Sequence, residues 1–179
     1  VLNLLGLRFA NRIFEPLFSA PNVERVEINF DEKLALEGRA GYYDNAGALV
    51  DMIQSHLLLV LALVAMEPPA SVDADDLRGG MAQVLRATRP WKRNGTSSRR
   101  ARYGAGTIDG KRLPAYIDEE GVDPARQTET LAEITLAIDN WRWAGVPFVL
   151  RSGKALGESR QEIVIVFRDV PPLPTGLRG

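Results

Sequence analysis

The chain of 179 residues contains no cysteine and a single histidine. Without cysteine it can form no disulfide, zinc finger or iron–sulfur centre, and it has no thiol nucleophile. One imidazole also excludes a histidine-rich metal site, and we expect no metal. The length allows one ordinary domain or two small ones, and 45% of the residues are hydrophobic. We therefore expect a globular core that is stable without disulfides or metal.

Long hydrophobic runs and a strong charge imbalance are also missing. The longest apolar run, Leu57–Met66, is shorter than a bilayer requires, so we expect a buried helix of a cytoplasmic protein and no membrane partner. The net charge of -1 and the pI of 5.9 argue against nucleic acid as a partner. A local basic cluster, Arg99, Arg100 and Arg102, keeps nucleic-acid binding open as a minor alternative.

No targeting segment and no nucleotide-binding loop can be recognised in the chain. It begins with valine rather than methionine, so we expect a portion of a longer protein. Neither G-x-G-x-x-G nor a Walker motif occurs, and the glycines at positions 38–47 do not lie between a strand and a helix of a βαβ unit. The sequence therefore predicts no dinucleotide-binding domain and no cofactor-binding residue within these 179 residues.

Apolar periodicity predicts a mixture of helices and strands. We expect helices over residues 3–18, 46–66 and 72–88, and strands over 23–30, 128–138, 146–152 and 162–168. Glycines predict an irregular loop over 32–47, and residues 89–127 predict only short elements, with a strand around Arg102 and Tyr103. Because helices and strands do not alternate regularly, the expected fold class is α+β, with a largely antiparallel sheet packed with helices.

His56 is the first candidate for chemistry because it is the only imidazole. A helix histidine satisfied by a neighbour is the simpler interpretation. Alternatively, His56 is a general base, since it lies where a polar helix start meets an apolar run, and a partly dry setting suits that role. Asp51 precedes it by five residues, which places the two side chains out of line on a straight α-helix.

Two groups of charged residues are further candidates. Glu32, Glu37 and Arg39 surround the end of the first strand, where they form either surface ion pairs or a sugar-binding rim. Lys154 and Arg160 flank the turn between the last two strands, where they either grip a phosphate or lie in a solvated turn.

Five segments of the chain together resemble one known family. They are LRFANRIFEPLF, EGRAGYYDNAGALVDMIQSHLL, LALVAMEPP, DNWRWAGVPFVLRSGKAL and EIVIVF. The motif GYYDxxGALxDMxQxH followed by MEPP, with RWxGVPFxLRxGK at a long interval, is highly specific. On these motifs nearly the whole chain resembles glucose-6-phosphate dehydrogenase. The resemblance implies that residues 1–179 are part of the C-terminal, substrate-binding and dimerisation domain of that enzyme.

The resemblance also implies roles for individual residues. His56 matches the general base that takes the anomeric hydroxyl proton, and Glu32 and Asp51 match carboxylates that hold sugar hydroxyls. Lys154 matches a substrate-binding lysine. The family's second cation would fall on Ser159, one step before Arg160, so Arg160 is the substitute we expect.

The implied activity is oxidation of glucose 6-phosphate to the 6-phosphogluconolactone, in the pentose phosphate pathway, with NADP or NAD as cofactor. The N-terminal Rossmann domain that binds this cofactor has no counterpart here. Nor has the segment that supplies the phosphate-binding histidine and tyrosine and the aspartate that orients the catalytic histidine. Without these parts, we expect that the isolated chain does not turn over glucose 6-phosphate. The resemblance also implies a homodimer or higher homo-oligomer. The alternative is a non-catalytic module for sugar-phosphate binding or oligomerisation.

Overall fold

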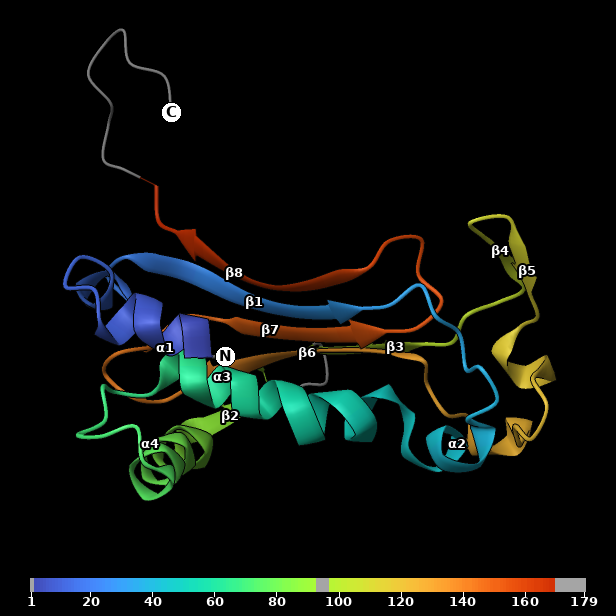
Figure 1. Cartoon of the computed structure of the whole chain (residues 1–179), viewed down its shortest axis with the longest axis horizontal. Helices are drawn as coiled ribbons and strands as arrows, with labels where there is room; N and C mark the ends of the chain where they lie inside the picture. Colours follow the sequence, from blue (N-terminus) through green and yellow to red (C-terminus); the bar gives the residue numbers. More distant parts are fainter. Residues whose placement is uncertain (1, 93–96, 170–179) are drawn as a thin grey trace, which may run out of the picture.

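The computed structural model describes residues 2–92 and 97–169, and its main part is a curved sheet with a helical layer along one face (Figure 1). The helices are α1 (Leu2–Phe9), α2 (Ala40–Ala48), the π-helix η2 (Leu49–Leu57), α3 (Leu58–Ala65) and α4 (Ala74–Ala87), with short 3-10 turns η1 (Glu15–Leu17), η3 (Tyr116–Asp118) and η4 (Pro124–Arg126). The strands are β1 (Val23–Asp31), β2 (Thr88–Pro90), β3 (Ser98–Ala101), β4 (Gly106–Ile108), β5 (Lys111–Leu113), β6 (Leu131–Ile138), β7 (Phe148–Gly153) and β8 (Arg160–Phe167).

The main sheet has the strand order β2-β6-β7-β1-β8, with β3 pairing β6 beside β2, and β4 and β5 form a separate hairpin. The pairings of β6 with β2, β3 and β7 are antiparallel, and so is that of β1 with β8. This confirms the expected α+β class with a largely antiparallel sheet. The central pair, β1 and β7, is parallel, which the sequence analysis did not anticipate.

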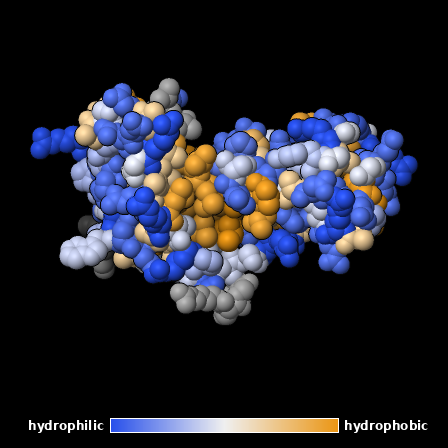
Figure 2. Space-filling view, turned by 90° about the horizontal axis from the view of Figure 1, so that it is seen from below, coloured by the Kyte–Doolittle hydropathy of each residue, from blue (hydrophilic) through white to orange (hydrophobic). Residues whose placement is uncertain are grey.

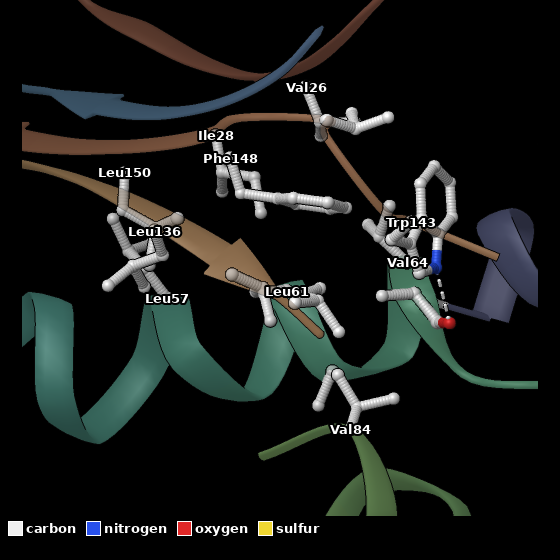
Figure 3. Close-up of a cluster of buried hydrophobic side chains, with 14 of the residues drawn as sticks. Val26, Ile28, Leu57, Leu61, Val64, Val84, Leu136, Trp143, Phe148 and Leu150 are labelled. Atoms are coloured by element: carbon white, nitrogen blue, oxygen red, sulfur yellow. Dashed lines mark hydrogen bonds between the residues drawn. The ribbon is translucent and has the colours of Figure 1, made fainter. Parts of the chain in front are cut away.

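The core lies between the helical layer and the sheet (Figure 3). Leu57 and Leu61 from the helices meet Phe148 and Leu150 from β7, because strand side chains alternate between faces while helix side chains repeat every three or four residues. Trp143 packs edge-on against Phe148 and donates its indole N–H to the last turn of α3, at Ala65 O, over 2.8 Å.

The main errors in the expected elements occur near proline and glycine. The first helix ends at Phe9 rather than at residue 18, and Pro16 lies in the separate turn η1. The expected loop over 32–47 contains α2, which bends at Gly47, where φ is +66°. The strand expected around Arg102 and Tyr103 is β3, which ends just before them.

The helical run Ala40–Ala65 is 26 residues long and, by length and hydropathy alone, apolar enough to cross a membrane. That finding differs from the expectation that the apolar run is too short. Core helices also meet this criterion, and Leu57, Leu61 and Val64 of this run are buried against the sheet. The packing therefore favours a core helix. Seen from the helix side, hydrophobic side chains gather over the middle of the molecule, where η2 and α3 run (Figure 2).

Candidate functional site

The parallel pairing of β1 and β7 positions the candidate site. Asp31, the last residue of β1, lies opposite Gly153, the last residue of β7. Because the two strands run in the same direction, the residues that follow them, Glu32 and Lys154, leave the sheet at the same edge. The Glu32 N–H donates to Gly153 O over 2.8 Å, and the Leu156 N–H donates to Glu32 O over 3.0 Å. These backbone bonds fix the two segments side by side.

Lys154 and Glu32 form an ion pair in this corner, with Nζ 2.8 Å from Oε2. Lys154 is only 7% exposed, so the solvated turn considered for it is wrong. Its ammonium also lies 5.4 Å from the centre of the Tyr43 ring, within the range of a cation–π contact. An ammonium carries three donors, so Lys154 can hold Glu32 and still donate to a ligand oxygen.

Tyr43, on α2, joins the site although the sequence analysis did not single it out. Its pKa is raised far above the usual range, first by burial and then by the negative charges of Asp51 and Glu129, with a smaller contribution from Glu32. Three carboxylates therefore act on the Tyr43 phenol: Asp51 from η2, Glu129 from the segment before β6, and Glu32 from the end of β1. The GYYD segment looked like loop in sequence, so no helical face marked Tyr43 as inward-facing.

Asp51 and His56 both lie on η2. In this π-helix each N–H bonds five residues back, as the Leu58 N–H does to Ile53 O at the helix end. Residues five apart are about 140° out of line on an α-helix, but on a π-helix they lie near the same face. The offset expected for a straight α-helix therefore does not apply to Asp51 and His56 on η2.

The surroundings of these two residues differ. Asp51 is partly buried and accepts a hydrogen bond from the Tyr42 hydroxyl over 3.1 Å. This hydrogen bond raises the pKa of Tyr42. His56 is exposed on the part of the chain that the structure describes, so the partly dry setting expected for it is not formed by these residues alone.

The remaining candidates lie outside this corner. Arg160 bonds Asp31 Oδ2 over 3.0 Å, and that bond raises its pKa; Arg151 bonds the same carboxylate. Glu37 pairs with Lys111 over 3.8 Å, and Arg39 is exposed at the start of α2. The structure thus brings Glu32 and Lys154 into contact but ties Arg160 and Glu37 to other partners.

The basic cluster is held by carboxylates of the next segment. Arg99 pairs with Glu133, and Arg100 Nη1 lies 3.9 Å from Glu129 Oε2. Both arginine side chains stay largely exposed in these pairs, so the minor alternative of a nucleic-acid patch stays a prediction. Over residues 2–92 and 97–169, no group of three or more histidine, aspartate or glutamate side chains is placed to hold a metal ion.

The fold and the site define a class of protein: a mixed α+β domain with a charged site where two parallel strands end in an otherwise antiparallel sheet. The family model described as glucose-6-phosphate dehydrogenase, C-terminal domain, matches residues 5–175. The chain belongs to this family.

Curated relatives and solved structures agree with this assignment. The glucose-6-phosphate 1-dehydrogenase of Zymomonas mobilis is 48% identical over 173 residues, covering 96% of this chain and 35% of that protein. The enzyme of Bacillus subtilis is 44% identical with the same coverage. A structure of glucose-6-phosphate dehydrogenase in complex with its substrate glucose 6-phosphate is similar with a TM-score of 0.86 at 38% identity, over 97% of this chain and 35% of that chain. The chain thus spans about a third of the length of these relatives.

Proposed function

We propose that the protein carrying this chain oxidises glucose 6-phosphate to the 6-phosphogluconolactone, with NADP or NAD as the hydride acceptor. The observation that carries the proposal is the corner where Glu32 and Lys154 meet, next to the π-helix that bears Asp51 and His56. Family membership and a structural relative described as bound to glucose 6-phosphate support the choice of substrate.

In this proposal Lys154, Glu32 and Asp51 bind the sugar phosphate. Lys154 offers donors to substrate oxygens while Glu32 keeps its charge balanced across the 2.8 Å contact. Glu32 and Asp51 accept hydrogen bonds from sugar hydroxyls, which are donors as well as acceptors. Arg39 and Arg160 are proposed only as peripheral cations, because Arg160 is already paired with Asp31.

His56 is proposed as the general base. A ring nitrogen of His56 accepts the C1–O–H proton of the sugar as C1 is oxidised to the carbonyl level. A nicotinamide held by another part of the protein would supply the acceptor for the C1 hydride. His56 is exposed on this chain, so a substrate can reach the imidazole, and the partly dry setting would have to come from parts of the protein outside this chain. Asp51 lies on the same π-helix, so in this proposal Asp51 holds the sugar while His56 takes its proton.

The described residues do not fit a dinucleotide. β1 and β7 are the parallel neighbours in the sheet, but no helix with a glycine-rich turn directly connects β1 to a parallel strand within the described residues. We propose that NADP or NAD is held by a part of the protein outside this chain, and we assign no residue here to it.

We also propose a cytoplasmic homo-oligomer. The edge strand β8 exposes Ile163 and Phe167, and Leu49, Val50 and Leu59 are exposed on the helical layer. Exposed apolar surface next to an open strand edge favours association. In analytical ultracentrifugation, the natural, full-length protein is expected to sediment as an oligomer. A monomer at high concentration would contradict this.

The experiment on His56 separates catalysis from mere binding. In the protein as made in its own cell, His56→Asn is expected to lower reduction of NADP or NAD by at least about a hundredfold, the usual contribution of a general base. The control Gln54→Ala changes an exposed neighbour on the same helix and is expected to stay near wild type. If glucose 6-phosphate binds by calorimetry but the wild type gives no turnover, the non-catalytic alternative is right.

A further inference from the structure

The segment Thr128–Thr130, just before β6, holds both halves of the candidate site. The Thr128 hydroxyl donates to Asp44 O, near the end of α2, over 2.6 Å. On the other side, the Lys154 N–H donates to Thr130 O over 2.9 Å. Glu129 lies between these two bonds. One short segment therefore sets the distance between the helical run and the turn that carries Lys154.

Glu129 itself binds the start of the π-helix. Its Oε1 accepts the Leu49 N–H over 3.0 Å, and its backbone carbonyl accepts the Ala48 N–H over 3.1 Å. These two N–H groups begin a new helical segment, where backbone donors have no partner within the helix. A carboxylate there is favoured both as a hydrogen-bond acceptor and by the helix dipole. The side chain is only 12% exposed, so it is held in a fixed place.

The glycine at the bend makes this contact possible. A Cβ at Gly47 would lie 2.7 Å from Glu129 Oε1, inside contact distance, and the φ of +66° also disfavours any other residue. The bend and the carboxylate therefore fit one another. They divide the helical run into α2, which carries Tyr43, and η2, which carries Asp51 and His56.

We propose that Glu129 is a positioning residue for the oxidation of glucose 6-phosphate: its carboxylate holds the first turn of η2, and so sets where Asp51 and His56 stand relative to Lys154. The inference rests on the proposed function. It adds a residue that touches none of the reacting atoms in this arrangement. The rise in the Tyr43 pKa, to which Asp51, Glu129 and Glu32 all contribute, supports the closeness of these groups.

The test compares three variants of the natural, full-length protein. Glu129→Ala removes the acceptor of the Leu49 N–H, while Glu129→Gln keeps an amide oxygen in its place. Glu133→Ala is the matched control, because Glu133 is 15% exposed, lies on β6 and pairs with Arg151 and Arg99 rather than with the helix. Hydrogen exchange at the Leu49 amide and steady-state kinetics with glucose 6-phosphate are measured for each.

Glu129→Ala is expected to speed exchange at Leu49 and to lower kcat by about 10- to 100-fold, since small displacements of reacting groups have effects of this size. KM should change less than kcat. Glu129→Gln should restore both readouts to within about threefold of wild type, and Glu133→Ala should leave them unchanged.

A normal kcat in Glu129→Ala, or an equal loss in Glu133→Ala, would overturn the proposal. Failure of the proposed function has a different signature, namely no turnover by the wild type. In that case the exchange rate at Leu49 still decides whether Glu129 holds η2, and unchanged exchange in Glu129→Ala would refute the structural part as well.

Discussion

The ion pair between Lys154 and Glu32 allows a sharp test of the site as a physical unit. Lys154→Met keeps the length of the side chain but removes its charge, and so leaves the Glu32 carboxylate without its 2.8 Å partner. The Lys154 side chain is 8% exposed and that of Glu32 is 21% exposed. Losing one member of a fully buried pair costs about 3–5 kcal/mol. Because Glu32 keeps some water, we expect a loss of about 2–3 kcal/mol in the free energy of unfolding.

The control is a pair of the same length at the surface. Lys33 Nζ lies 2.9 Å from Asp109 Oδ2, but these side chains are 39% and 69% exposed. Lys33→Met should therefore cost less than about 1 kcal/mol. Urea unfolding followed by tryptophan fluorescence, to which the buried Trp143 contributes, measures both variants. In thermal unfolding, the Lys154→Met loss corresponds to a Tm lowered by about 5–10 °C.

A double variant identifies the cause of the loss. Lys154→Met combined with Glu32→Gln removes both charges and should recover most of the stability, because an apolar or neutral pair leaves no unpaired charge behind. If Lys154→Met lowers the free energy of unfolding no more than Lys33→Met does, burial does not strengthen the pair of Lys154 with Glu32, and the prediction is wrong. If the double variant is as unstable as Lys154→Met, the loss comes from packing around the lysine stem instead.

Two further predictions concern backbone and pH. Gly47→Ala should destabilise the chain by about 1–3 kcal/mol because of the positive φ and the 2.7 Å approach of Glu129, whereas Gly41→Ala, with open space at its Cβ, should be neutral or stabilising in urea unfolding. The hydrogen bond from the Arg142 side chain lowers the pKa of Glu67 below its ordinary value of 4.5. The Glu67 carboxylate therefore stabilises the fold at pH values above this ordinary pKa, and the stabilisation is lost as the pH falls through the lower pKa of the folded state. Glu67 is 59% exposed, so Glu67→Gln should reduce the acid dependence of unfolding by less than about 1 kcal/mol; a larger change would contradict this account.

Much of the architecture could be predicted from the sequence because each strand carries its own pattern. Residues 23–30 largely alternate apolar and polar side chains, and β1 spans Val23–Asp31 with Val23, Val26 and Ile28 buried. The helix expected over 72–88 is α4, Ala74–Ala87, despite its two central glycines. These elements are local, so their side chains report the structure directly.

Pairing and helix type could not be predicted in the same way. The parallel register of β1 with β7 joins residues more than a hundred positions apart, and nothing in either strand distinguishes a parallel from an antiparallel partner. The π-helix likewise depends on tertiary contacts, since Glu129 binds its first turn from a segment that the sequence predicted to be strand. The sequence could nominate Glu32, Asp51, His56 and Lys154, but not the residues that hold them.

The parallel pair explains why the nominated residues meet at all. In an antiparallel pair, the residues after β1 and β7 would emerge at opposite edges of the sheet, and Glu32 would lie a full strand length from Lys154. Parallel pairing brings these two strand ends together, and Thr130 O then bonds the Lys154 N–H from the start of β6. The neighbouring Glu129 binds the helix that bears Asp51 and His56. Among the described residues, the mainly antiparallel sheet thus supplies the scaffold, and the parallel pair of β1 and β7 brings Glu32 and Lys154 together. In the proposed function, changes that shift the register of β1 against β7 should therefore affect substrate binding before they affect the rest of the fold.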